Sequence, residues 1–304
     1  MDGALKTNYI MQYIIQLFFN IILSSSLYLL LSVSYSFIYY PTNIFHIVHA
    51  AVITLSAYFV YLFNNTFSLP LSFAIFAGIL TSTIIGLLCE VLVYRKIRRK
   101  IFPLLSSFIA SIGLYLVLQN TTSLLFGDSA KIINTSEITV GHQIFGGYLT
   151  TVQILIISIS LTLFMWTYLF MHYTKTGKSI RAVSCNPELC NIFGISSEKI
   201  ILISFAIGSA LAAIAGILSA MDTNMTPTFG FNLLLYGVVA MIIGGVGSTR
   251  GLLAGSLLVA TAQNLAAFYL DTKWMNAITY VILILFLIWK PLGFSGNRLK
   301  KVEV

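Results

Sequence analysis

The residues with the most obvious chemical potential are Thr176, Gly177, Lys178 and Ser179, which resemble the end of a phosphate-binding loop. In such a loop, backbone amides and the lysine hold nucleotide phosphates, and another glycine stands five residues before the Gly-Lys pair. That position is His172 here, and the preceding segment is apolar like a membrane helix rather than a soluble strand. We therefore expect no ATP binding by this chain, so any ATP-driven work must come from a partner chain.

Two histidines, His46 and His49, are three residues apart and would share one face of a helix. They could bind a metal or relay protons, but two ligands are too few for a structural zinc site. No acidic residue or third histidine lies nearby in the sequence. A polar face toward the bundle interior is the favoured interpretation.

The rest of the sequence carries no recognisable catalytic motif. It has no Gly-x-Ser-x-Gly turn and no His-Glu-x-x-His helix. The cysteines Cys89, Cys185 and Cys190 lack metal-site spacing and are expected to stay as thiols. We predict a chain that is not an enzyme, with no catalytic residues, no metal and no cofactor.

The composition shows which elements must position these side chains. Apolar residues make up 58% of the chain, charged residues 9%, and the mean hydropathy is +0.93, whereas soluble domains are about 25% charged. A spanning helix needs about 20 apolar residues, so the 304 residues predict an all-α integral membrane protein with about eight or nine helices in a single domain, 1–304. The apolar runs are 14–40, 43–63, 70–93, 104–126, 149–171, 199–221, 232–246, 252–270 and 274–289.

The basic residues orient these helices. Fourteen of the 17 lysines and arginines fall in loops on one side of the predicted bundle. These are Arg95, Lys96, Arg98, Arg99, Lys100, Lys175, Lys178, Arg181, Lys199, Arg250, Lys290, Arg298, Lys300 and Lys301. We expect a multi-pass protein of the cell (plasma) membrane. The positive-inside rule places these basic loops on the cytoplasmic side, and the loops with Asp128, Glu137, Asp222 and Asp271 on the external side. The side of the N-terminus stays open. The net charge of +8 is explained by membrane lipid rather than by nucleic acid.

Small residues predict close helix packing late in the chain. Gly208, Ala212 and Gly216 repeat every four residues, as do Gly247, Gly251 and Gly255. Such stripes let helix backbones approach closely, so two closely packed late helices are expected. The run from Gly244 to Ser248 interrupts its helix, either as a break that lines a transport path or as a tight loop between two helices.

Several segments together resemble one protein family, the H-type permease subunits of ABC importers for branched-chain amino acids. The resemblance extends from about His46 to Asn264. Its most specific part is Ser107–Leu114, which continues into Leu118-Gln119-Asn120 and Leu125-Phe126-Gly127. Glu90, Tyr94, Arg95 and Arg98 are similar to the family's Glu-x-x-x-Tyr-Arg-x-x-Arg signature.

The resemblance also implies a cytoplasmic coupling segment at about 172–198 that docks on an ATPase subunit. Its expected residues are Arg181, Ala182, Asn186, Leu189, Gly194 and Ile195. A short amphipathic helix ended by glycine suits a loop that transmits a rigid-body push. A simple surface loop is the alternative.

The implied assembly joins this chain to a second homologous permease, two cytoplasmic ATPase subunits and an external solute-binding protein. Candidates for the substrate path are His49, Gln119, Asn120, Gln263 and Asn264. For each of them an interhelical hydrogen bond is the favoured alternative. The expected solute is a branched-chain or other hydrophobic amino acid. Urea, short amides and other small amino acids are alternatives. A stand-alone secondary transporter would need an inverted repeat and ionisable residues at the midplane. The sequence shows no convincing repeat, and its acidic residues are confined to loops and to the ends of the apolar runs.

Overall fold

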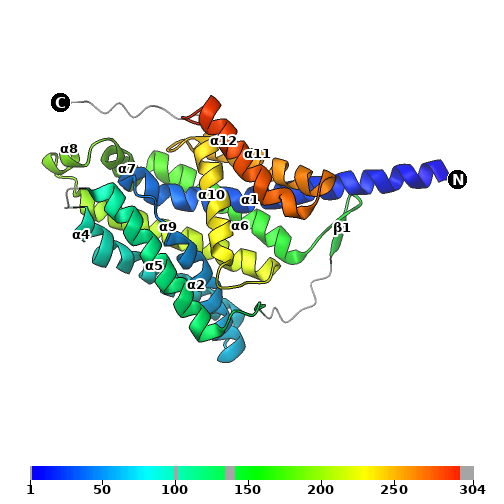
Figure 1. Cartoon of the computed structure of the whole chain (residues 1–304), viewed down its shortest axis with the longest axis horizontal. Coiled ribbons are helices and arrows are strands. Elements are labelled where there is room, and N and C mark those ends of the chain that lie inside the picture. The colour runs from blue at the N-terminus through cyan, green and yellow to red at the C-terminus, as the bar shows by residue number, and fades with distance from the viewer. Residues whose placement is uncertain (1, 99–101, 134–140, 295–304) are drawn as a thin grey trace.

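A computed structural model describes residues 2–98, 102–133 and 141–294 as one bundle of helices (Figure 1). The α-helices are α1 Asp2–Thr42, α2 His49–Tyr61, α3 Leu71–Cys89, α4 Arg95–Ile97, α5 Pro103–Phe126, α6 Thr151–Tyr173, α7 Lys175–Cys185, α8 Pro187–Ile192, α9 Ser197–Asp222, α10 Phe229–Gly244, α11 Thr249–Tyr269 and α12 Met275–Trp289. Two π-helices, η1 Leu62–Thr66 and η2 Glu90–Tyr94, extend α2 and α3, and a 3-10 helix, η3 Thr272–Trp274, precedes α12. The predicted all-α membrane bundle is confirmed.

Each of the nine apolar runs of the sequence forms a helix, and seven of these helices have spanning length. Among the described residues, seven helices are long and apolar enough to cross a membrane. They are Met11–Thr42, Leu71–Ile97, Pro103–Phe126, Thr151–Tyr173, Ser197–Asp222, Thr249–Tyr269 and Thr272–Trp289. The other two runs form α2, with 13 residues, and α10, with 16 residues. At a rise of 1.5 Å per residue they are about 20 and 24 Å long, so each is shorter than the hydrocarbon layer.

A small hairpin connects α5 to α6 beside the N-terminal half of α1. Strands β1 His142–Ile144 and β2 Gly147–Leu149 pair antiparallel, with Gln143 opposite Tyr148. The Gln16 amide of α1 donates to the Tyr148 carbonyl at 3.2 Å and accepts from its N–H at 2.9 Å. Thr150 then caps α6 in a capping box. The Thr150 hydroxyl accepts from the Gln153 N–H, and the Gln153 side chain accepts from the Thr150 N–H.

The two ends of α1 show which side of the membrane the N-terminus lies on, a point that the sequence left open. The last turn of α1 lines a groove with Arg98 and Ser184, at the end where the basic loops gather. Its N-terminal half lies beside the hairpin at the opposite end (Figure 1). By the positive-inside rule the chain begins outside and α12 ends in the cytoplasm. Arg99, Lys100, Glu137, Arg298, Lys300 and Lys301, which contributed to the predicted orientation, lie outside the described residues.

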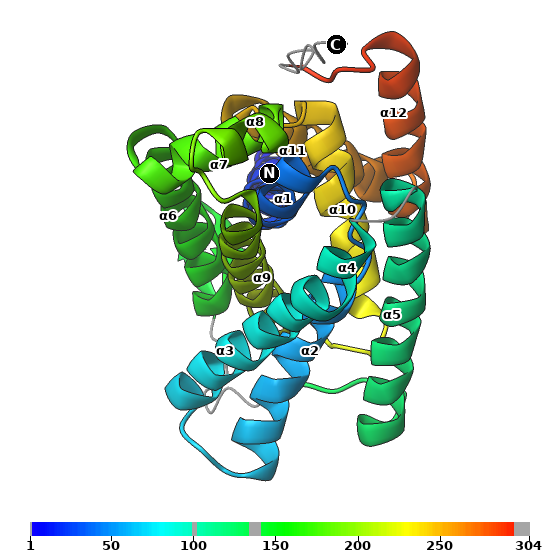
Figure 2. The same ribbon diagram turned by 90° about the vertical axis from the view of Figure 1, so that its left-hand side faces the viewer.

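Helix α1 forms the centre of the bundle. It packs against α6, α7, α9, α10 and α11, and Figure 2 shows it enclosed by these helices. Its stretch from Leu29 to Ile38 is almost completely buried. By contrast α5 and α12 lie at the periphery and carry many exposed apolar side chains, as expected for surfaces that meet lipid or other subunits.

Glycines allow the close contacts around this centre. A Cβ at Gly208 would lie 2.8 Å from the Ser34 carbonyl of α1, and a Cβ at Gly216 would overlap the Ile53 carbonyl of α2. On α11, a Cβ at Gly251 or Gly255 would overlap backbone atoms of α10. Each of these helices therefore approaches its neighbour at backbone distance.

The expected close packing of two late helices is found between α10 and α11, at Gly251 and Gly255. The Gly208–Gly216 stripe of α9 faces α1 and α2, because α1 occupies the centre of the bundle. Gly247, expected on the same helix as Gly251 and Gly255, instead precedes α11 in a loop, with φ +84°, and a Cβ there would overlap the ring of Tyr40.

We predict that Gly251→Ala destabilises the folded chain by about 1 to 3 kcal/mol, because the added methyl group would force α10 and α11 apart. The matched control is Gly113→Ala on α5, where no other atom lies within 4 Å of the new Cβ. This variant should be neutral or stabilising by up to about 1 kcal/mol. Thermal unfolding in detergent measures both. Equal melting temperatures for the two variants would contradict the packing described for Gly251.

Candidate coupling and translocation sites

The segment that resembles a phosphate-binding loop forms the corner between α6 and α7. A single residue, Thr174, separates the two helices. Its hydroxyl donates to the Phe170 carbonyl at 2.7 Å and accepts from the Gly177 N–H at 3.0 Å. A side chain at Gly177 would overlap the backbone of Phe170 and Met171. The glycine therefore makes a tight helix corner, and its amide is already bonded within the chain.

The α7–α8 segment is a compact unit closed by its own hydrogen bonds. Asn186 ends α7 and caps α8, because its side chain accepts from the Leu189 N–H at 2.9 Å. The Ser197 hydroxyl at the start of α9 donates to the Pro187 carbonyl at 2.6 Å, and the Ser197 N–H donates to the Asn191 side chain at 2.9 Å. Both ends of α8 are thereby fixed to α9.

Gly194 ends α8 in a Schellman motif. Its φ is +82°, its N–H donates to the Asn191 carbonyl at 3.1 Å, and the Ile195 N–H donates to the Cys190 carbonyl at 2.9 Å. A glycine accommodates this φ without strain. The predicted glycine-ended short helix is therefore present as a defined structure.

One face of α8 is apolar and exposed at the cytoplasmic end. Leu189 is 50% exposed, Ile192 79% and Phe193 75%, whereas Ile180 and Val183 of α7 are buried against the bundle. We call Leu189, Ile192 and Phe193 the apolar tip. Sequence reasoning named Leu189 as a candidate residue and placed Phe193 in the coupling segment through its resemblance. It missed Ile192, and the signal that could have found it is the pair of large apolar residues directly before Gly194.

The other expected coupling residues have different surroundings. Asn186, Leu189 and Gly194 are exposed, and Ala182 and Ile195 are half-buried. Arg181 lines a cavity between α7 and the α10–α11 loop, and its Nε is buried. Its side chain therefore faces the bundle of this chain, away from the apolar tip.

Two ion pairs connect the end of α3 to its neighbours. Glu90, which is almost fully buried, accepts two hydrogen bonds from Arg98, one of them at 3.0 Å. Arg95 pairs with Glu198 in the first turn of α9. The first pair holds η2 and α4 together, and the second joins them to α9 beside the α7–α8 unit. The half-exposed Arg95 pair contributes little to stability.

His46 and His49 are buried where α1 is connected to α2. His46 Nδ1 lies 2.8 Å from the Tyr94 hydroxyl, and His49 Nε2 lies 3.1 Å from the Ser34 hydroxyl. Their second ring nitrogens have no described partner. The Ser111 hydroxyl of α5 accepts from the Ile47 and Val48 amides at 2.6 and 3.2 Å and so caps α2 from outside the helix. Each histidine thus has its own hydroxyl partner.

The remaining path candidates divide into two groups. The Gln263 side chain accepts from the Tyr28 hydroxyl and donates to the Thr279 hydroxyl at 2.6 Å, so it links α11 to α1 and α12. Asn264 donates to the Ser24 hydroxyl at 3.3 Å. Among the described residues, Gln119 and Asn120, on the outer half of α5, bond only to each other and to their own helix. Of the five candidates, these two have no partner on another described helix.

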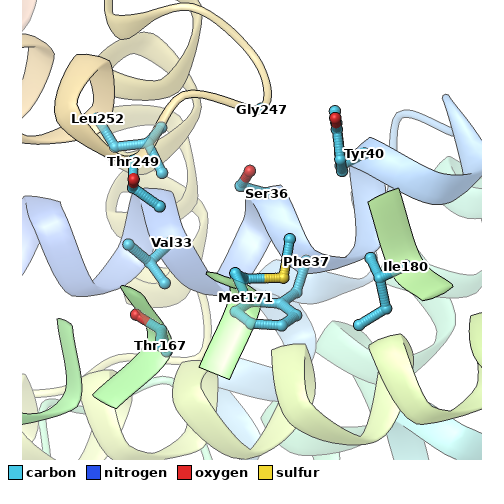
Figure 3. A pocket seen from close by; sticks show the side chains of 10 residues that line it. All are labelled: Val33, Ser36, Phe37, Tyr40, Thr167, Met171, Ile180, Gly247, Thr249 and Leu252. Carbon is cyan, nitrogen blue, oxygen red and sulfur yellow. The ribbon is translucent and has the colours of Figure 1, made fainter. Parts of the chain in front are cut away.

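The α10–α11 connection is a tight loop. Gly245 and Gly247 have φ of +94° and +84°, and Ser248 accepts from the Gly251 N–H at 3.2 Å to begin α11. Figure 3 shows the cavity beside it, between Phe37 of α1, Met171 of α6 and Gly247. Its volume is about 30 Å³, roughly the share of one water. Of the two interpretations of Gly244–Ser248, the geometry favours the loop.

The comparison with known families decides the class of this protein. A family model described as "Branched-chain amino acid transport system / permease component" matches residues 17–287. The chain belongs to this family. No solved structure matches it significantly.

Three curated relatives place this permease among similar proteins. The branched-chain amino acid permease LivH of Salmonella typhimurium is 26% identical over 298 residues, covering 94% of this chain and 96% of LivH. The corresponding permease BraD of Pseudomonas aeruginosa is 28% identical, covering 90% and 92%. The xylose permease XylH of Haemophilus influenzae is 35% identical over 120 residues, 37% of this chain and 32% of XylH.

Family membership confirms several expectations from the sequence. The chain is a multi-pass membrane permease, a transport subunit of the ABC type rather than an enzyme. Permeases of this family work with ATPase subunits and a solute-binding protein. The match covers both the α7–α8 unit and the central helix α1, so the geometry described above belongs to the permease core.

We predict that Gln263→Leu destabilises the permease by about 1 to 2 kcal/mol, because the Tyr28 and Thr279 hydroxyls would lose a buried partner. Asn120→Leu is the matched control and should change stability little, because this amide bonds only within α5. Thermal unfolding in detergent compares the two variants. A larger loss for Asn120→Leu would contradict the division of the path candidates.

Proposed function

We propose that this permease carries branched-chain or other hydrophobic amino acids into the cell as part of an ABC importer. The assembly would contain a second homologous permease, two cytoplasmic ATPase subunits and an external solute-binding protein. Its full-length similarity to the branched-chain amino acid permeases LivH and BraD supports this class of solute. The chain would supply the path, and the ATPase subunits would supply the energy.

The observation that carries the proposal is the apolar tip on a rigid cytoplasmic unit. Ile192 and Phe193 are more than 70% exposed, at the end of the molecule where the basic loops gather. Apolar side chains at such a position are typical of a protein-binding surface. A groove on an ATPase subunit would bury this tip. The expected coupling residues Asn186, Leu189 and Gly194 form and end the short helix that presents it.

The connections of the α7–α8 unit suggest how motion reaches the membrane. A push on α8 would move α6 through the corner at Thr174 and Gly177, and α9 through the hydrogen bonds of Ser197. Helix α9 in turn contacts α1 and α2 along its glycine face. Because these contacts are close-packed, the helices would move as rigid bodies and alternate access between the two faces.

Gln119 and Asn120 are our proposed solute contacts on α5. Within the part of the chain that the structure describes, their amides make no bonds to other helices. Uncharged amides suit the ammonium and carboxylate groups of an amino acid in an apolar environment. His49, Gln263 and Asn264 would support the path by holding helices together. Urea, short amides and other small amino acids are the alternative solutes to test beside leucine.

We predict that Phe193→Ser weakens the association with the ATPase subunits by about tenfold or more, because an exposed aromatic anchor would be lost. The matched control is Phe145→Ser in the hairpin at the external end, which is 90% exposed. Affinity purification of the tagged full chain, with quantification of the ATPase that co-purifies, measures both. Undiminished ATPase recovery with Phe193→Ser would rule out the tip as the docking site.

We predict that Gln119→Leu lowers leucine uptake by roughly tenfold, because one hydrogen bond to a charged group of the solute would be lost. ATPase association should not change. Thr162→Val on the exposed face of α6 is the control, since this hydroxyl bonds only to the Ser158 carbonyl of its own helix at 2.7 Å. Normal uptake by Gln119→Leu at normal expression would remove this residue from the path, and parallel assays with urea would identify another solute class.

A further inference from the structure

A second, larger cavity lies at the cytoplasmic end between α6, α7 and the α10–α11 loop. Its volume is about 330 Å³, within the range of small-molecule sites. Polar side chains of Tyr168, His172, Arg181 and Arg250 line it. It adjoins the small cavity of Figure 3, with which it shares Tyr40, Met171, Gly247 and Thr249. The coupling unit and the membrane bundle therefore meet around this cavity.

The side chains that line the cavity include positive charges and no negative charge to neutralise them. Four arginines have described side chains. Arg95 and Arg98 are in ion pairs, whereas Arg181 and Arg250 have no carboxylate partner among the described residues, and both line this cavity. The Arg181 Nε is buried and has no hydrogen-bond partner there. A buried guanidinium nitrogen without an acceptor is unfavourable, so this site is complementary to an anion.

The backbone adds further donors. Helix α11 has 21 residues and begins at Thr249, at the edge of the cavity. Ser248 caps the Gly251 amide, which leaves the amides of Thr249 and Arg250 outside the helical ladder. The partial positive charge of this helix end acts in the same direction as the two guanidinium groups.

We propose that this cavity binds a phosphate group. Two guanidinium groups and a helix N-terminus offer several N–H donors from different sides, which matches a tetrahedral anion with several acceptor oxygens. The cavity lies at the cytoplasmic boundary of the membrane, so the phosphate can be the headgroup of an anionic phospholipid or part of a soluble compound. A ligand held by Arg181 of α7 and Arg250 of α11 would connect the coupling unit to the bundle.

The test uses the full-length permease purified in a neutral detergent. Its melting temperature and its lipid adducts in native mass spectrometry are measured with short-chain phosphatidylglycerol, short-chain phosphatidylcholine or inorganic phosphate. We expect phosphatidylglycerol or inorganic phosphate to raise the melting temperature. Arg250→Gln should weaken this effect by roughly tenfold in concentration, because one bidentate contact would be lost.

Two further variants make the result specific. Lys199→Gln removes a positive charge from an exposed position at the same end of the molecule, outside the cavity, and should bind as the wild type does. Arg181→Gln should repeat the loss seen with Arg250→Gln, and it provides the test if that variant does not fold.

The probes distinguish the source of the phosphate. Stabilisation by phosphatidylglycerol but not by inorganic phosphate would identify a lipid headgroup, and stabilisation by inorganic phosphate alone would identify a soluble ligand. No rise in melting temperature with either phosphatidylglycerol or inorganic phosphate would overturn the proposal. Equal stabilisation by phosphatidylcholine and phosphatidylglycerol would overturn the assignment to an anionic lipid. Equal binding by the wild type, Arg250→Gln and Arg181→Gln would overturn the proposal as well.

Discussion

The close contact of α1 with the glycine faces of α9 and α10 is the interaction on which the rest of this structure depends. Gly208 lies against the backbone of Ser34, and Gly237 lies against Leu31. In a bilayer, lipid tails are as apolar as the helices, so association depends on close packing and hydrogen bonds. Larger side chains at these glycines would displace two helices from the centre at once. The α7–α8 unit and the short helix α2 are both held by helices that this contact positions.

A second constraint is that every backbone polar group at membrane depth needs a partner. The chain meets it where α1 is connected to α2. The Tyr35 hydroxyl accepts from the His46 amide at 3.1 Å, and Ser111 accepts from the next two amides. Conspicuous polar residues of the sequence therefore hold the fold together here. The same is true of Gln263, whose amide joins three helices. Polarity within an apolar run indicates an interior position, and a free amide such as Gln119 is the better indication of a solute path.

Much of this architecture could be predicted from the sequence, because lipid imposes simple rules. The nine apolar runs became nine helices, and the alternation of basic and acidic loops gave their orientation. Which helices pack together could not be predicted. The glycine stripe of α9 could pack against any helix with a smooth surface, and it contacts α1 and α2 because α1 lies at the centre of the bundle. The coupling segment was located from its resemblance. The inward position of Arg181 and the exposure of Ile192 depend on how α7 and α8 lie on the bundle, which local sequence does not encode.

The central claim is that this chain provides a path whose movement is driven by cytoplasmic ATPase subunits. The most direct test is solute flux into vesicles that contain the purified full-length chain, alone and together with its co-purified partners, with and without ATP. The account predicts leucine uptake only with a second permease, the ATPase subunits, the binding protein and ATP all present. Concentrative uptake by the chain alone, driven by an ion gradient and unaffected by ATP, would contradict it.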